Sequence, residues 1–263
     1  MDGALQVLLT PDPTQKAEKA RELRKIWMAQ GNIGQAKRSP NAPARPSLPK
    51  LVTPNKVPRR AIGSPKGRGA LLHAIAHIEL NAIDLAADMI VRFTHASELA
   101  ENDRADFITD WTSVCDDEAR HFLMLNQRLT ELNMSYGDCL AHNGLWDAAQ
   151  NTAHDFTARL AVAPLVLEAR GLDVTPGMIK KLTQVGDMES VTILKTIYNE
   201  EIAHVSIGAK WFQYAAKVKN REPESLFHET VRKYYKGRVK PPFNVQARTL
   251  AGLTEAFYRP LAI

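Results

Sequence analysis

Two short motifs in this chain pair a glutamate with a histidine three residues later. Glu118 precedes His121 in the run DEARH, and Glu201 precedes His204 in the run EEIAH. Residues three apart lie on one face of a helix, so each motif presents a carboxylate and an imidazole to the same neighbour. Oxygen and imidazole ligands together suit iron, manganese or zinc.

Two single glutamates extend this pattern. Glu79 and Glu168 each interrupt an otherwise apolar helical stripe, and the order along the chain is glutamate, motif, glutamate, motif. Four carboxylates inside a bundle would repel one another, whereas two divalent cations would balance their charge. The alternative is a coincidental set of buried salt bridges, which would lack enough basic partners. The pattern therefore predicts a di-metal site with six ligands: Glu79, Glu118, His121, Glu168, Glu201 and His204.

The elements that must position these residues are four long helices. Apolar residues recur at spacings of three and four over residues 69–96, 102–133, 147–170 and 187–218, which is the helical period. Pro164 should kink the third helix, and Gly171 should end it. A short helix at 176–186 and tail helices near 222–236 and 245–257 complete the pattern. No segment is predicted as a strand, so the fold class is an all-α four-helix bundle.

The N-terminal region differs from this bundle in charge and composition. Residues 1–70 carry 14 Lys/Arg and 4 Asp/Glu (+10), and the remaining 20 bases and 25 acids give −5. A helix is predicted at 14–30, and residues 31–69 hold seven prolines and no acid, which predicts extended chain lying on the body. We expect three parts: a basic arm (1–68), the bundle (69–218) and a helical tail (219–263). The arm should lie across the acidic domain of its own chain or of a partner, with binding of nucleic acid or an anionic surface as the alternative.

Composition excludes several classes of protein. The chain has 263 residues, 44% hydrophobic, so it can bury a core. Its two cysteines cannot build a disulfide framework, which favours a reducing compartment. It has no run of 18 apolar residues and no basic, apolar leader at its start. We expect a soluble cytoplasmic protein without a membrane span.

Four stretches resemble a bacterial ferritin-like family catalogued as a domain of unknown function. They are LLHAIAHIELNAIDLAADMIVRF, DEARHF, APLVLEARGLD and NEEIAHVSIGAKWF, and VPRRAIGSPKGRGALLHAIAHIE also fits. The resemblance covers nearly the whole chain. It implies a ferritin-like core and the same six residues as ligands of two iron ions, with manganese as the alternative. A more distant similarity, in fold and ligand order alone, is to di-iron tRNA hydroxylases.

These features favour an oxidoreductase that activates dioxygen, either an oxidase or a hydroxylase of unknown substrate. The long arm and tail argue against a storage cage, and two cysteines cannot build the iron domain of a rubrerythrin-like peroxidase. No flavin or nicotinamide motif is present, so we expect a small-molecule substrate and an external electron donor. The alternatives are a nucleic-acid-modifying hydroxylase and a non-catalytic iron-binding scaffold.

Several residues on the ligand stripes receive structural interpretations. His73 and His77 are four apart and are predicted to support the fold or the ligands. Core packing is the favoured role for Trp111, Tyr198 and Cys115.

Charged residues beside the stripes are predicted to lie off the ligand face. Asp117 and Glu200 each directly precede a predicted ligand, and Arg120 is expected to pair with one of them. Asp84 and Asp88 are expected to be solvated or paired with arginine.

Overall fold

The computed structural model describes residues 1–32, 34–58 and 61–263. Over these residues it contains helices and turns and no strand, so the predicted all-α class is confirmed. Three residues of the expected arm, at positions 33, 59 and 60, lie outside the described part. The helices are α1 (Asp2–Leu8), α2 (Pro13–Gln30), α3 (Pro65–Phe93), α4 (Arg104–Glu131), α5 (Gly144–Asn151), α6 (Phe156–Val162), α7 (Ala169–Gln184), α8 (Met188–Val218), α9 (Pro223–Tyr234), α10 (Val245–Leu250) and α11 (Glu255–Tyr258).

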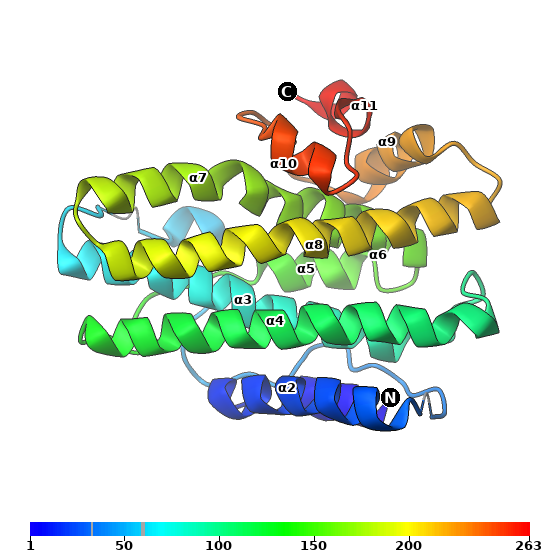
Figure 1. Cartoon of the computed structure of the whole chain (residues 1–263), viewed down its shortest axis with the longest axis horizontal. Helices are drawn as coiled ribbons and strands as arrows, with labels where there is room; N and C mark the ends of the chain where they lie inside the picture. The colour runs from blue at the N-terminus through cyan, green and yellow to red at the C-terminus, as the bar shows by residue number, and fades with distance from the viewer. Residues whose placement is uncertain (33, 59–60) are drawn as a thin grey trace.

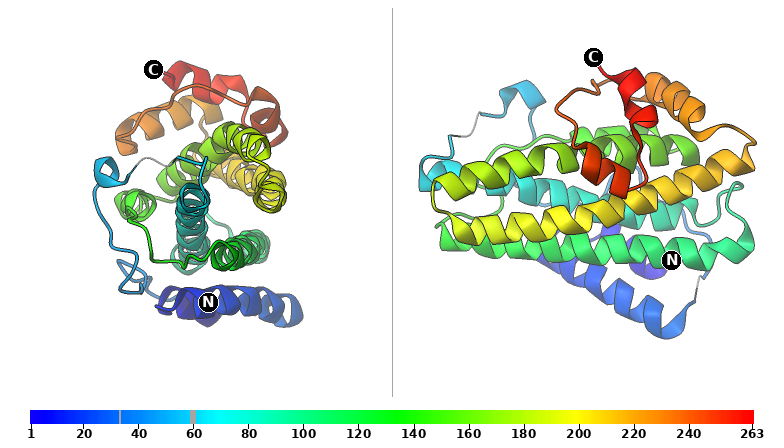
Figure 2. Two further views of the ribbon diagram at one scale, coloured as in Figure 1. Left: turned by 90° about the vertical axis from the view of Figure 1, so that its left-hand side faces the viewer. Right: turned by 45° about the horizontal axis from the view of Figure 1, so that its top comes forward.

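Four long segments run side by side along the longest axis of the molecule (Figure 1). They are α3, α4, α8 and the α6–α7 segment, and the end-on view shows their axes nearly aligned (Figure 2). Their apolar stripes meet in one core that includes Ile90, Phe107, Leu125 and Trp211. Burial of these stripes supplies the main driving force for packing the helices together.

Short polar side chains fix where these long helices begin. Ser64 accepts a hydrogen bond from the amide of Gly67 at the start of α3 (3.1 Å), and Asp187 accepts one from Ser190 at the start of α8 (3.2 Å). Such caps satisfy amides that have no partner within the helix. The observed bounds of α3, α4 and α8 fall within a few residues of the predicted ones.

The third predicted helix, 147–170, differs from the structure in two ways. It has a break between α5 and α6 that was not expected, and it continues past Gly171, where it was expected to end. Helix α5 ends at Asn151, and α6 begins four residues beyond Thr152. The chain then forms a π-helical turn over Ala163–Glu168 and runs on as α7 to Gln184. Pro164 has no amide hydrogen to donate, so the expected kink takes the form of this wider turn. Gly171 lies inside α7, because packing of the segment on α8 overrides the local preference of glycine.

The two N-terminal helices pack on helices of the bundle. Helix α2 packs along α4, and α1 packs on α3. The indole of Trp27 donates to Thr109 Oγ1 (2.8 Å), and Arg24 donates to the Thr109 carbonyl (2.8 Å). Further along the arm, the amide of Val52 donates to the carbonyl of Ala141 (2.8 Å). The arm is therefore attached through side-chain and backbone contacts at both ends.

The C-terminal tail forms a cap of three short helices over α7 and α8 (Figure 2). The expected helix at 245–257 is two separate helices, α10 and α11. Asn244 donates to the Tyr198 hydroxyl of α8 (2.8 Å), and its amide donates to Asp173 of α7 (2.9 Å). Among the described residues, no helix combines the length and the apolar character needed to cross a membrane.

Candidate metal centre

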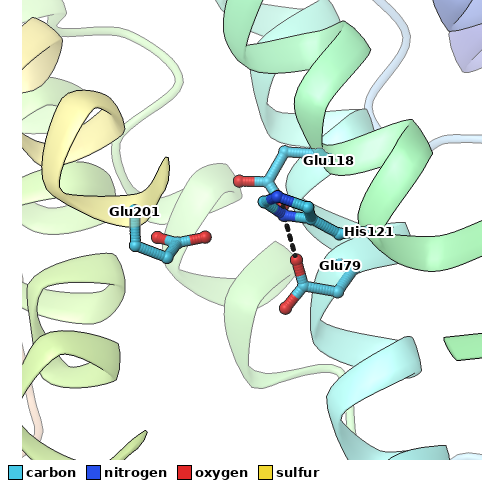
Figure 3. A group of neighbouring side chains, drawn as sticks. All are labelled: Glu79, Glu118, His121 and Glu201. Carbon is cyan, nitrogen blue, oxygen red and sulfur yellow. Dashed lines mark hydrogen bonds and ion pairs between the residues drawn. The ribbon is translucent and has the colours of Figure 1, made fainter. Parts of the chain in front are cut away.

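Three helices bring four of the predicted ligands together inside the bundle. Glu79 comes from α3, Glu118 and His121 from α4, and Glu201 from α8 (Figure 3). One ligand atom from each of the four lies within 4.8 Å of the others. The side chains of Glu79, Glu118 and His121 are at most 5% exposed, and that of Glu201 is 12% exposed. Such a cluster of buried oxygen and nitrogen donors has the dimensions of a metal-ion site.

The second histidine faces the same cluster. His204 Nδ1 lies 3.0 Å from Glu118 Oε1 and 3.5 Å from Glu201 Oε1. His121 Nδ1 lies 3.0 Å from Glu79 Oε2 and 3.6 Å from Glu118 Oε2. Glu118 therefore stands between the two imidazoles, with one oxygen toward each. This is the position of a carboxylate that could bridge two metal ions.

Glu168 lies near this cluster, at the end of the π-helical turn. It is the last residue of that turn, and the negative charges of Glu201 and Glu118 act on it electrostatically. The residue keeps part of its surface accessible, but its Oε2 atom is enclosed and has no hydrogen-bond partner among the described residues. π-Helical turns within longer helices occur frequently at functional sites.

Both imidazoles are held from behind by carboxylates. His121 Nε2 lies 2.6 Å from Glu200 Oε2, and His204 Nε2 lies 3.3 Å from Asp117 Oδ2. A carboxylate only accepts, so each Nε2 carries a hydrogen, and Nδ1 is the ring nitrogen that faces the cluster. The acid that directly precedes each motif thus orients the histidine of the other motif.

Arg120 links the two outer carboxylates. Its Nη2 donates to Asp117 Oδ1 (2.6 Å) and to Glu200 Oε2 (2.9 Å). The expectation that Arg120 pairs with one of them was too narrow, because it bridges both. The outer role of Asp117 and Glu200 was not predicted. The only signal for it in the sequence is that an acid directly precedes the glutamate of each motif.

The carboxylates of the cluster differ in how burial and charge affect them. Burial, then the charges of Glu201 and Glu118, raise the pKa of Glu168 to about 8. Burial and the charge of Glu118 also raise the pKa of Glu79 and Glu201. Burial opposes ionisation of Glu118 as well, but its contacts with His121 and His204 outweigh this and hold its pKa well below the usual range.

The histidines respond in the opposite direction. Burial lowers the pKa of His121, yet the facing Glu118 and Glu79 outweigh this and raise it to about 11. Asp117 and Glu118 likewise raise the pKa of His204 well above its ordinary value against the effect of burial. Protons therefore balance the charge of the cluster when no cation is bound. Cations that bind there must displace these protons.

Several buried atoms of the cluster lack hydrogen-bond partners among the described residues. They include both carboxylate oxygens of Glu118 and Nδ1 of His204, although the two groups face each other closely. Buried polar atoms of this kind are rare in proteins and need an explanation such as an ion. The buried carboxylates and imidazole of this cluster could hold a metal ion.

Two other histidines of α3 do not belong to the cluster. His77 Nδ1 lies 2.7 Å from the Tyr136 hydroxyl, and Nε2 lies 3.1 Å from the His142 carbonyl. His73 Nε2 accepts from the amide of Gly137 (2.9 Å) and stacks on Tyr136. Both histidines hold the segment after α4 in place, which agrees with the predicted structural role.

The other residues of the stripes have packing roles. Trp111 is buried beside Phe107, and Cys115 is buried with its thiol near the Ile83 carbonyl (3.8 Å). Tyr198 attaches the tail, as described above. These positions agree with the predicted core roles.

Asp84 and Asp88 are buried and paired, so the expectation of pairing is correct and the alternative of solvation is wrong. Asp84 pairs with Lys16 of α2 and lies 3.4 Å from Arg45. Asp88 pairs with Arg159 of α6 and with Arg92 (2.8 Å). These pairs connect α3 to the arm and to α6.

Most of the chain matches one known protein family. A family model described as "Protein of unknown function (DUF455)" matches residues 9–259. The chain belongs to this family. The chain is also similar to an uncharacterized protein of Haemophilus influenzae, 42% identical over 215 residues, which are 82% of this chain and 75% of that protein. No solved structure matches the chain. The predicted membership in a family of unknown function is confirmed.

Proposed function

We propose that this DUF455 protein is a ferritin-like di-iron carboxylate protein that activates dioxygen to oxidise or hydroxylate a small molecule. The observation that carries the proposal is the meeting of both Glu-x-x-His motifs around Glu118, whose two oxygens face the two imidazoles. In this proposal residues 69–218 form the ferritin-like bundle, residues 1–68 the arm and residues 219–263 the tail. The same order of glutamates and motifs holds two metal ions in ferritin-like bundles.

The proposed ligands divide into bridging and terminal groups. Glu118 would hold metal on both sides, because its two oxygens face different histidines. His121 and His204 supply the nitrogen ligands, each oriented by an outer carboxylate. The remaining three glutamates, Glu79, Glu168 and Glu201, complete the set. Four carboxylates favour iron or manganese over softer metals.

Bound iron would supply the Lewis acidity and the redox electrons for dioxygen chemistry. Hydroxylation consumes R–H, O2, two electrons and two protons, and yields R–OH and water. The chain has no flavin or nicotinamide motif, so the electrons require an external donor. Glu200 has 31% of its side chain exposed and contacts His121 Nε2, so this carboxylate connects the imidazole to the surface.

Two alternatives make different predictions. A non-catalytic iron-binding scaffold would bind metal and consume no dioxygen. A nucleic-acid-modifying enzyme would use the basic arm, but the described contacts engage Lys16 with Asp84 and Arg21 with Asp116 of the same chain. The structure therefore provides no observation that favours nucleic acid as the partner.

The test is iron content and dioxygen consumption of the full chain purified with iron. We expect about two irons per chain, loss of iron in Glu118→Ala and Glu201→Ala, and retention in Glu189→Ala, an exposed acid of the same helix α8. Ferrous protein should consume dioxygen. A wild type without metal, whose two ligand variants fold equally well, would contradict the metal site. Iron binding without any dioxygen consumption would contradict the enzymatic function and favour the non-catalytic iron-binding scaffold.

A further inference from the structure

A cavity of about 700 Å3 lies between the bundle and the tail. Its walls include Ile78 of α3, Leu145 of α5, the π-helical turn at 165–167, and the tail around 234–243. Cavities of roughly 300–1,000 Å3 are the size that encloses small-molecule ligands. The tail therefore forms one wall of a ligand-sized space.

The interior of this cavity is mainly apolar. Its lining includes Leu165, Val166, Phe227 and Phe243. Ile78 is the only exposed residue between positions 75 and 91 of α3, with 49% of its surface accessible. An exposed isoleucine in an otherwise buried stretch, facing a cavity, indicates an apolar occupant.

The mouth of the cavity is cationic. Lys236, Arg238 and Lys240 line it, are exposed, and form no ion pair within the described part of the chain. The lining holds two acids, Asp147 and Asp173, against five Lys/Arg side chains. Asp173 is neutralised by Arg248, which donates to both of its oxygens (2.8 and 2.7 Å), so the lining keeps an excess of positive charge over Asp147. The positive charge at the mouth is therefore available to an anionic group.

The wall of this mouth is held in a defined position. Arg170 of α7 donates to the carbonyls of Lys240 (2.8 Å) and Pro242 (3.0 Å). The amide of Asn244 donates to Asp173. These contacts anchor the segment that carries the cations to the helix that follows Glu168, so the site is preorganised.

The cavity also borders the elements that carry the metal cluster. Ile78 directly precedes Glu79, and Leu167 directly precedes Glu168. A molecule in the cavity would lie against the backbone of α3 and the π-helical turn at these positions.

We propose that this cavity binds an amphipathic anion, with an alkyl or prenyl body inside and a carboxylate or phosphate head at Lys236, Arg238 and Lys240. Binding is argued from the cavity alone. Its role as the substrate of the adjacent cluster rests on the proposed function. The apolar lining takes the body out of water, and the three cations favour a charged head over a neutral one.

The experiment is titration calorimetry of the full chain with four probes below their micelle concentrations. Laurate and dodecyl phosphate carry the two anionic heads, dodecanol has a neutral head, and butyrate lacks the long body. We expect both twelve-carbon anions to bind at least tenfold more tightly than dodecanol, and butyrate not to bind. Over the fatty acids of eight to twelve carbons, affinity should rise by about fourfold per methylene. The tighter of the two anions identifies the head group.

Two sets of variants separate head from body. The triple variant Lys236→Gln, Arg238→Gln, Lys240→Gln should lose the preference for anions and keep the affinity for dodecanol. Its control, Lys25→Gln, Lys195→Gln, Lys217→Gln, changes three exposed lysines outside the cavity and should bind as the wild type does. Ile78→Trp should weaken every twelve-carbon probe at least tenfold, whereas Ile26→Trp, at an exposed position on α2, should not.

The proposal is overturned if the wild type binds no twelve-carbon anion, if dodecanol binds as tightly as laurate, or if the charge variants behave alike. Because Ile78→Trp lies next to a predicted ligand, its fold is checked by circular dichroism, and the surface triple variant tests the proposal independently. Titrations are repeated after chelator treatment. Laurate binding without iron binding would refute the proposed function and keep the cavity assignment. Iron binding without laurate binding would refute the cavity assignment and keep the proposed function.

Discussion

His121 Nε2 lies 2.6 Å from a carboxylate oxygen of Glu200, a residue of the other motif. The reciprocal contact joins His204 to Asp117 at 3.3 Å. The two motifs are thus cross-connected, with the acid that precedes each glutamate orienting the opposite imidazole. Helices α4 and α8 therefore position both histidines through their mutual packing.

The first prediction tests this orientation. Glu200→Ala should weaken iron binding by about 10- to 100-fold, because His121 loses the acceptor that fixes its tautomer. Glu200→Gln should recover part of the affinity, since an amide oxygen still accepts from Nε2. Affinity is measured by competition with a chelator. Glu189→Ala, with 68% of its side chain exposed, is the control on the same helix, and wild-type affinity in Glu200→Ala would refute the role.

The second prediction concerns the pH dependence of the metal-free protein. Burial raises the pKa of Glu168 to about 8, so between about pH 4.5 and 8 the folded state holds a proton that the unfolded state releases. The free energy of unfolding of the wild type should therefore fall as pH rises through this window, and that of Glu168→Gln should fall less. Urea unfolding at pH 6 and pH 8 measures the difference. An equal loss of stability in wild type and variant would contradict the assignment.

The third prediction concerns the contact between α8 and the π-helical turn. A Cβ atom on Gly208 would lie 2.4 Å from Pro164 Cβ and 2.7 Å from its Cγ. Gly208→Ala should therefore destabilise the fold by about 1–3 kcal/mol and lower the iron content, because it displaces the turn that ends at Glu168. Thermal unfolding and metal analysis measure both effects.

Gly171 provides the matched control for this substitution. It lies within α7, and no atom lies within 4 Å of the position of its Cβ. Gly171→Ala should stabilise the protein by roughly 0.5–1 kcal/mol. Alanine has fewer backbone conformations in the unfolded chain than glycine, so it loses less entropy when it enters the helix. If both alanine variants changed stability equally, the steric argument would fail.

The fourth prediction concerns the buried pair of Asp88 and Arg159. Burial raises the pKa of Asp88, but the charges of Arg159 and Arg92 outweigh this and lower it. Asp88→Asn should cost about 3–5 kcal/mol at pH 7, since it leaves a buried guanidinium without its counter-charge. Asp106→Asn, at an exposed position, should cost little.

The sign of the pH effect follows from the direction of this shift. The contribution of Asp88 is present above about pH 4, where the unfolded carboxyl is ionised, and it is lost as pH falls through the lower folded pKa. The gap between wild type and Asp88→Asn in urea unfolding should therefore narrow below pH 4. A gap that stayed constant there would show that Asp88 contributes through packing rather than through charge.

The sequence by itself was sufficient for the long helices α3, α4 and α8 and for the four polar residues that meet between them, Glu79, Glu118, His121 and Glu201. Glu79, Glu118 and Glu201 stand out because a carboxylate within an apolar stripe of period 3.6 must face a core. The spacing of three then places each histidine on the same face as its glutamate. These inferences depend on local periodicity, which the sequence contains in full.

The tertiary structure decided what depends on contacts between distant segments. The roles of Asp117 and Glu200 require α4 and α8 to lie side by side, and the burial of Asp84 and Asp88 requires Lys16 and Arg159 to arrive from other helices. Gly171 remains helical because its segment packs on α8, against its local preference. The cavity exists because the tail folds back over the π-helical turn. No periodic pattern in the sequence indicates these relationships, because each joins residues that are distant along the chain and that only the packing of the helices brings together.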